Sequence, residues 1–176
     1  MSSKLEYSQV IALSPNRLQT FSATLPSPFK PTYFAFGCES LINIVNRTDF
    51  SRITIPTPDA TSPVISLTFS GTNYLFCLNK NGILYAYLRN SFSSGPIGSY
   101  NINCTPISLA ASNRFIFYIY DKTLFQLSID DFLTKKREPK KLTDQNEEKF
   151  TELSISPCGR ALTIYTIGEK YPEIWF

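Results

Sequence analysis

Short apolar runs separated by polar turns recur along the whole chain. Four of these runs are short and β-like and end in a serine, at Ser14, Ser70, Ser112 and Ser156. A polar turn, a second apolar run, a polar gap and a third apolar run follow each serine. Runs of this length, rich in β-branched and aromatic residues and bounded by turn residues, are typical of strands. The pattern therefore predicts antiparallel strands joined by tight turns.

The predicted strands repeat in four units. The second strands are expected at 33–38, 74–78, 115–120 and 161–167, and the third strands at 41–45, 83–88, 123–129 and 173–176. The first three units also have a fourth strand, expected at 51–56, 97–102 and, from a weaker pattern, 139–143. Asn81-Gly82 predicts a type I′ hairpin turn, because both central positions of that turn need positive φ. Residues 130–136 are expected to make one helical turn.

The spacing of the four serines sets the length of the repeat. Successive serines are separated by 56, 42 and 44 positions. The last two spacings match the period of about 40–45 residues of a four-stranded propeller blade. The first is longer, and residues 21–31, rich in Pro and Ser, are interpreted as an inserted loop. The chain is thus read as one domain, with blade-like units at 7–60, 61–104, 105–149 and 150–176. An all-β sandwich or barrel is the alternative fold.

Residues 156–160 give the repeat a family resemblance. Ser156-Pro157-Cys158-Gly159-Arg160 resembles the Ser-Pro-x-Gly turn of WD40-type β-propellers, and Ser156 and Gly159 are its defining positions. Residues 66–88 are similar to one blade of that family in their strand–turn–strand cadence, and Trp175 stands where the third-strand tryptophan would be. The resemblance implies an all-β, WD40-like propeller in which the four serines mark structural turns.

The family's Gly-His and Trp-Asp dipeptides are absent from the chain. The polar network that those residues build in standard blades therefore cannot form here. We expect the blades to pack through aromatic side chains, such as those of Phe76, Tyr85, Phe117 and Phe125.

The unit count predicts an incomplete ring. Three units are complete, whereas the fourth reaches only its third strand, so Trp175 and Phe176 are expected at an open strand edge. About three and a half blades fall short of the four to eight that propellers have. Three explanations remain open: the chain is the N-terminal piece of a longer propeller, two copies close one ring, or a different subunit supplies the missing strands.

Composition removes several classes of chemistry. The chain contains no histidine, which excludes Ser-His-Asp and Cys-His catalysis and histidine-containing zinc sites. Its four cysteines are far apart and form no CxxC pair, so they are expected to be reduced thiols and not disulfides or metal ligands. The glycines form no phosphate-binding loop. We expect a protein that is not an enzyme and that holds no cofactor or metal.

Charge and hydropathy set the expected compartment. The net charge of +3 is too small to indicate nucleic acid or a membrane surface by itself. No apolar stretch approaches the roughly 18 residues that span a bilayer, and the first residues lack the apolar region of a signal peptide. We therefore expect a cytoplasmic or nuclear protein without membrane contact.

One charged segment stands out, at 135–141. It carries Lys135, Lys136, Arg137, Lys140 and Lys141 against a single Glu138. It could contact phosphates of RNA or anionic lipid. The favoured interpretation is a solvated loop, because acidic residues follow it at 144–148. The adjacent pair Asp130-Asp131 is expected to start a helix or turn and not to serve as a metal or acid–base site.

Two further loops are candidates for contact with partners. Segment 20–32, with Phe21 and Phe29, is expected to bind a partner or cap a blade, and segment 90–96 is expected to be a flexible loop. The sequence thus predicts a non-catalytic scaffold that presents loops to other proteins in a larger assembly. The alternative is an RNA-binding or ribonucleoprotein-assembly module that uses 135–141.

Overall fold

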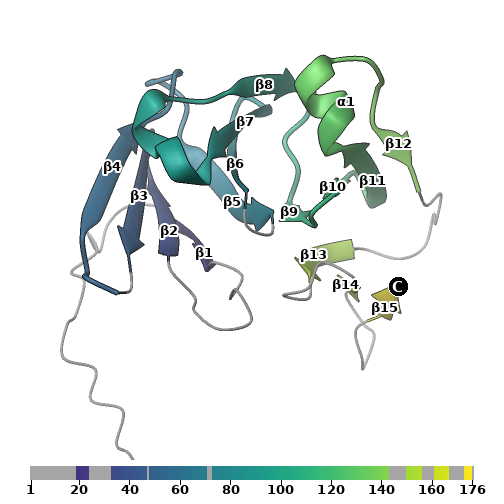
Figure 1. The fold of residues 1–176 in the computed structure, drawn as a ribbon. Coiled ribbons are helices and arrows are strands. Elements are labelled where there is room, and N and C mark those ends of the chain that lie inside the picture. Colours follow the sequence, from purple (N-terminus) through teal and green to yellow (C-terminus); the bar gives the residue numbers. More distant parts are fainter. Residues whose placement is uncertain are drawn as a thin grey trace, which may run out of the picture.

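The computed structural model describes residues 19–23, 33–46, 48–70, 73–142, 150–155, 161–166 and 173–175. These residues form four antiparallel sheets (Figure 1). Within each sheet the strands follow one another in space in the same order as in the chain.

Three of the sheets have four strands and the fourth has three. The first sheet consists of β1 (Gln19–Ala23), β2 (Tyr33–Cys38), β3 (Leu41–Asn46) and β4 (Arg52–Pro56). The second consists of β5 (Val64–Ser70), β6 (Tyr74–Asn79), β7 (Ile83–Leu88) and β8 (Gly98–Asn101). The third consists of β9 (Ser108–Ala111), β10 (Phe115–Tyr120), β11 (Thr123–Ser128) and β12 (Lys140–Lys141). The fourth consists of β13 (Phe150–Ile155), β14 (Leu162–Thr166) and β15 (Glu173–Trp175).

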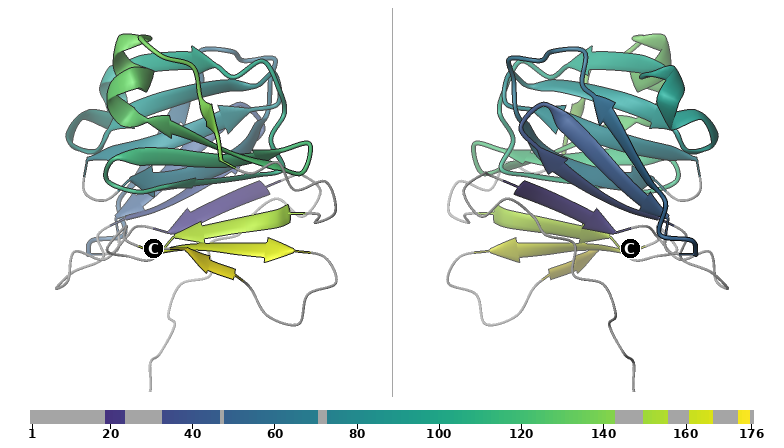
Figure 2. Two further views of the ribbon diagram at one scale, coloured as in Figure 1. Left: turned by 90° about the vertical axis from the view of Figure 1, so that its right-hand side faces the viewer. Right: turned by 90° about the vertical axis from the view of Figure 1, so that its left-hand side faces the viewer.

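The sheets fan outward from their first strands. β1 contacts β5, β5 contacts β9, and β9 contacts β13. The later strands of each sheet lie progressively farther from these inner strands (Figures 1 and 2). The arrangement matches the radial stacking of blades that the sequence predicted.

Three apolar layers hold neighbouring sheets together. Between the second and third sheets, Phe76 and Leu78 pack with Ile116 and Tyr118. Leu75 and Cys77 alternate with them along β6 and pack toward the first sheet instead. Because both faces of β6 are buried, its sequence is a continuous apolar run and not an alternating one. Each such side chain contributes about 1.5–3 kcal/mol through burial of apolar area.

Of the four aromatic residues expected to pack the blades, Phe76, Tyr85 and Phe117 are buried. Phe125 is half-buried and packs against the layer between the second and third sheets. Tyr85 belongs to the layer between the first and second sheets, and Phe117 to the layer between the third and fourth. Aromatic packing between sheets is thus a feature of the fold.

The first strand differs from the prediction. Residues 19–23 form β1, which overlaps the stretch 21–31 that we interpreted as an inserted loop, and Ala23 pairs with Phe34 as Ser70 pairs with Tyr74. Ala23 therefore occupies the place expected for Ser14, which lies outside the described residues. Ala23 precedes Ser70 by 47 positions, against 42 between Ser70 and Ser112, so the repeat is more even than the serines suggested.

Two hairpin turns join the second and third strands of their sheets. Asp121 and Lys122 join β10 to β11 with φ of 45° and 61°, the signature of a two-residue type I′ turn. Asn81-Gly82 lies in the hairpin that joins β6 to β7, as predicted, but the turn is not of type I′, because only Gly82 has positive φ, at 77°. The amide of Gly82 donates to the carbonyl oxygen of Asn79 at 3.1 Å, which makes a three-residue turn closed by glycine.

Segment 90–96 is packed and not a free loop, which corrects the prediction. It lies largely within the 3₁₀ helix η1 (Arg89–Ser94). Phe92 is only 3% exposed and meets Tyr33 edge-on, with ring centroids 5.8 Å apart. A single buried aromatic thus fixes this segment against the first sheet. The sequence missed it because the surrounding serines and glycine resemble a linker.

The expected helical turn is α1 (Ile129–Thr134). Ser128 is its N-cap, and the Ser128 hydroxyl accepts a hydrogen bond from the amide of Asp131 at 2.9 Å. Asp130 and Asp131 occupy the first turn, where carboxylates favour the helix dipole. In the part of the chain that the structure describes, no helix is long and apolar enough to cross a membrane.

Candidate interaction site

The basic segment 135–141 is exposed at the outer edge of the third sheet. Lys135 ends α1 with a left-handed backbone, at φ 54°, and Lys136 and Arg137 follow in solvent. Lys140 and Lys141 form β12, which pairs with β11 and is the outermost strand of its sheet. Lysine on an edge strand opposes pairing with other chains, because burying its charge is unfavourable. This placement agrees with a solvated segment whose basic side chains are exposed.

Only some of the other predicted site residues belong to the part of the chain that the structure describes. Five of them lie outside it: Ser14, Phe29, Ser156, Gly159 and Phe176. Phe21 lies in β1, paired with Phe36. Trp175 lies in β15, paired with Leu162, and β15 is an edge strand of the fourth sheet.

Ser70 and Ser112 link neighbouring sheets. The hydroxyl of Ser70 donates to the carbonyl oxygen of Ser112 at 2.5 Å, and both residues are buried. The hydroxyl oxygen of Ser112 in turn accepts from the amides of Phe115 at 2.9 Å and Arg114 at 3.2 Å. Serine is suited to both positions because a small hydroxyl can both donate and accept where the backbone turns.

The outer face of the first sheet carries a small polar cluster. Asn43, which is 2% exposed, accepts through Oδ1 from Arg52 Nε at 3.0 Å and from Thr54 Oγ1 at 2.9 Å. The guanidinium of Arg52 lies 5.7 Å from the ring centroid of Phe36. Cation–π contact and hydrogen bonding together hold Arg52 flat against this face.

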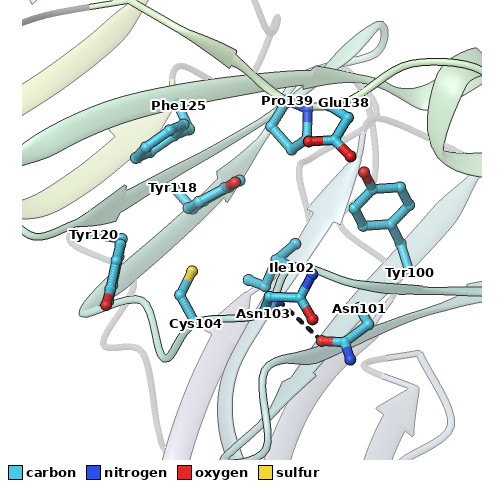
Figure 3. A pocket seen from close by; sticks show the side chains of 10 residues that line it. All are labelled: Tyr100, Asn101, Ile102, Asn103, Cys104, Tyr118, Tyr120, Phe125, Glu138 and Pro139. Carbon is cyan, nitrogen blue, oxygen red and sulfur yellow. Dashed lines mark hydrogen bonds between the residues drawn. The ribbon is translucent and has the colours of Figure 1, made fainter.

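A pocket of about 300 Å³ lies in the groove between the second and third sheets. It is lined by Tyr100 from β8, by Tyr118 and Tyr120 from β10, by Phe125 from β11 and by Glu138 beside β12. Segment 101–104 and Pro139 complete the lining (Figure 3). The inner strands β5 and β9 contribute none of the lining residues, so the pocket belongs to the outer part of the groove.

Sheet register places the aromatic wall of the pocket. Tyr118 pairs with Phe125 across β10 and β11, which puts both side chains on the face toward the second sheet. Their rings are stacked, with centroids 5.1 Å apart and planes 9° apart. Tyr120, two residues along the same strand, points to the same side and remains 43% exposed. The wall is therefore rigid at Tyr118 and open at Tyr120.

The opposite wall is held by hydrogen bonds that two backbone amides donate. The amide of Ile102 donates to the carbonyl oxygen of Gly82 at 3.0 Å, and the amide of Asn103 donates to Asn101 Oδ1 at 2.9 Å. A Cβ atom at Gly82 would collide with the carbonyl oxygen of Cys104, so only glycine permits this close approach. Tyr100 is supported from behind by Phe132 of α1, with ring centroids 6.4 Å apart.

Burial raises the pKa of three titratable groups that line the pocket. Burial raises the pKa of Tyr118 well above its usual range, and the nearby Cys104, Tyr100 and Glu138 raise it further. Burial and the charge of Glu138 raise the pKa of Tyr100, and burial raises the pKa of the Cys104 thiol. Both phenols and the thiol are therefore protonated at neutral pH. Glu138 supplies the one formal charge among the lining residues.

The sequence did not reveal this pocket. Phe125 was expected only as packing, and Tyr100, Tyr118 and Tyr120 looked like ordinary strand residues. The alternation of side chains along a strand would have placed Tyr118 and Tyr120 on one face of β10. Nothing in the sequence indicated that a pocket would remain between these side chains and segment 101–104. Among the described residues, no group of three or more cysteine, aspartate and glutamate side chains could hold a metal ion.

Comparisons with known proteins show the class of the fold. No protein-family model matches the chain, and no curated protein matches it. Among solved structures, the β-propeller domain of Cps50 (Swd1) from Myceliophteria thermophila is similar, with a TM-score of 0.59 over 84% of this chain at 17% identity. The match covers 53% of that structure's chain, so this chain spans about half of its length.

The fold is therefore that of an all-β propeller whose ring is not closed. At this sequence identity the likeness extends to the fold alone. It bears out the propeller over the sandwich or barrel alternative, and the radial meanders of the four sheets agree with it (Figure 2).

Proposed function

We propose that this protein is a non-catalytic interaction scaffold that contributes a WD40-like propeller segment to a larger assembly. The observation that carries the proposal is the formed pocket in the groove between the second and third sheets, beside the exposed basic segment. A rigid propeller positions such surface features without chemistry of its own. The absence of histidine and of a phosphate-binding loop supports a role in binding and not in catalysis.

The open ring is the second part of the proposal. We infer that further strands complete it, because the chain spans about half of the similar propeller domain and β15 is an edge strand. Unpaired edges are normally covered in native proteins. The strands come from more of the same polypeptide, from a second copy or from another subunit.

RNA binding is the alternative, and the exposed basic residues beside tyrosines favour it. Base stacking needs an accessible aromatic face. Tyr118 is only 3% exposed, and its ring is stacked on Phe125. Among these two rings and that of Tyr120, the ring of Tyr120 is the most accessible. One accessible ring beside a charged segment supports weak, salt-dependent contact with RNA more than it supports recognition of a particular base sequence.

The proposal is tested by affinity purification of the tagged protein from its own cells, followed by mass spectrometry with and without nuclease. Recovery of the same protein partners after nuclease treatment supports the scaffold. Recovery of RNA with no reproducible protein partner would replace it with the RNA-binding alternative. A matched sample with Lys135, Lys136 and Arg137 changed to glutamine shows whether the basic segment contributes.

A further inference from the structure

The pocket combines aromatic rings with a single carboxylate. Figure 3 shows the Glu138 carboxylate and the Tyr100 hydroxyl directed toward each other, with Tyr118 across from them. Phe125, Ile102 and Cys104 supply apolar lining (Figure 3). Such a pocket has one acidic end, which borders a π-rich wall, and one end suited to a hydrocarbon chain.

The acidic end carries one carboxylate, that of Glu138, which is exposed. Burial raises the pKa of Tyr100 and of the Cys104 thiol, so both groups stay protonated at neutral pH. The hydroxyl of Tyr100 adds a hydrogen-bonding group beside the carboxylate (Figure 3). An anionic group entering here would meet Glu138 at short range, whereas a cation would meet a carboxylate and electron-rich rings.

Resting on the scaffold function above, we propose that this pocket binds a cationic side chain of a protein partner, an arginine or a lysine. Its charged head lies beside Glu138 between Tyr100 and Tyr118. Its methylene stem lies along Phe125 and Ile102. A long basic side chain fits because its stem buries apolar area while its head remains hydrogen-bonded.

The basic residues next to Glu138 in the chain restrict the partner further. Lys135, Lys136 and Arg137 are exposed and directly precede Glu138, so positive charges adjoin the one carboxylate of the pocket. A basic residue flanked by acidic residues matches both charges. A uniformly basic segment is repelled by Lys135, Lys136 and Arg137, and a uniformly acidic one leaves the pocket empty.

The test uses the full chain and four acetylated, amidated pentapeptides of sequence Glu-Asp-X-Asp-Glu, with arginine, lysine, trimethyllysine or norleucine at X. Binding is followed by NMR of the tyrosine and phenylalanine side chains. We expect saturable shifts of Tyr100, Tyr118 and Tyr120 with the three cationic peptides. The norleucine peptide, which matches the lysine stem but lacks the charge, should bind about tenfold more weakly.

The variant Glu138→Gln should reduce affinity for the arginine peptide about tenfold, because it removes the charge-assisted hydrogen bonds. Glu152→Gln is the matched control, since Glu152 is an exposed glutamate on β13 that does not line the pocket. Tyr120→Ala tests the aromatic wall separately, and this variant should retain the fold because Tyr120 is exposed. Thermal unfolding of each variant checks that the fold is retained.

Equal binding of the norleucine peptide, or unchanged binding by Glu138→Gln, overturns the proposal. Stronger displacement of the peptide by a uridine oligomer, with shifts of the same residues, overturns it in favour of nucleic acid. The scaffold function fails independently. If purification from cells yields no protein partner while the arginine peptide still binds, the pocket stands without the scaffold. If partners persist unchanged with Glu138→Gln, the scaffold stands without the pocket.

Discussion

The ring of Tyr118 lies parallel to that of Phe125, with centroids 5.1 Å apart. The two residues are direct cross-strand neighbours in β10 and β11. One face of Tyr118 is therefore covered by its own sheet, and the hydroxyl edge is directed into the pocket (Figure 3). The same contact stabilises the third sheet and shapes the candidate site.

Replacing Phe125 with alanine should destabilise the protein by about 2 kcal/mol, because the stacked contact and half-buried apolar area are lost together. Urea unfolding measures the change. Ile107→Ala is the control, because Ile107 is 62% exposed and its loss should change the free energy of unfolding by less than about 0.5 kcal/mol. Equal effects of the two changes would show that the stacked pair has no special contribution.

The close approach of Gly82 to Cys104 gives a second prediction. Gly82→Ala should cost about 2–4 kcal/mol, because it adds a collision with the backbone of Cys104 to the strain of positive φ. Gly95→Ala is the matched control. Gly95 has φ of 82°, but a Cβ atom there meets nothing within 4 Å, so only the strain of about 1 kcal/mol applies.

Denaturant unfolding of the two glycine variants separates the two costs. A difference of less than about 0.5 kcal/mol between them would mean that segment 101–104 moves aside without penalty. In that case the pocket wall is less rigid than its hydrogen bonds suggest.

The hydrogen bond from the Ser70 hydroxyl to the carbonyl oxygen of Ser112 predicts that losing it lowers the free energy of unfolding. Ser70→Ala should destabilise the protein by about 1–3 kcal/mol, because a buried carbonyl oxygen loses its partner. Ser51→Ala removes an exposed hydroxyl that donates to Asp49 at 2.7 Å, and it should change the free energy of unfolding by less than about 0.5 kcal/mol. Thermal unfolding of both variants provides the comparison, and equal melting temperatures would contradict a structural role for this bond.

The order of strands was predictable from the sequence, whereas the first strand and the pocket were not. The runs at 74–78 and 115–120 are apolar throughout because both faces of β6 and β10 are buried, which makes such strands easy to recognise. β1 has only five residues, and the prolines and serines that follow it resemble a loop. The pocket depends on where segment 101–104 stops against the third sheet. That distance is set by packing between sheets and leaves no pattern along the chain.

One buried thiol and two buried phenols predict how the free energy of unfolding responds to alkaline pH. Burial raises the pKa of Cys77, Tyr87 and Tyr118 in the folded protein. The unfolded chain releases these protons near pH values of about 8.5 for cysteine and about 10 for tyrosine. Above those values the folded state binds more protons than the unfolded state, so the free energy of unfolding falls as pH rises. Below about pH 8 this contribution is fully present.

Chemical denaturation between pH 7 and pH 11 measures this dependence. Cys77→Val removes one of the three groups, so its stability should fall less steeply between about pH 8.5 and pH 10 than that of the wild type. Native Cys77 should also resist alkylation by iodoacetamide at pH 8, since it is 0% exposed and protonated, and should react after unfolding. Stability that is flat or rising up to pH 11 would show that these groups are not protonated in the fold.

The open ring predicts how the isolated chain behaves in solution. The fourth sheet ends at β15, and Tyr165 in β14 is 39% exposed on its outer side. If two copies close one ring, light scattering after size exclusion should give twice the chain mass of 19.9 kDa. If more of the same polypeptide or another subunit completes the ring, the isolated chain should aggregate, and the added strands should restore a single species. A stable 19.9 kDa monomer that does not self-associate would contradict all three completions, because it would show that the open edge needs no cover.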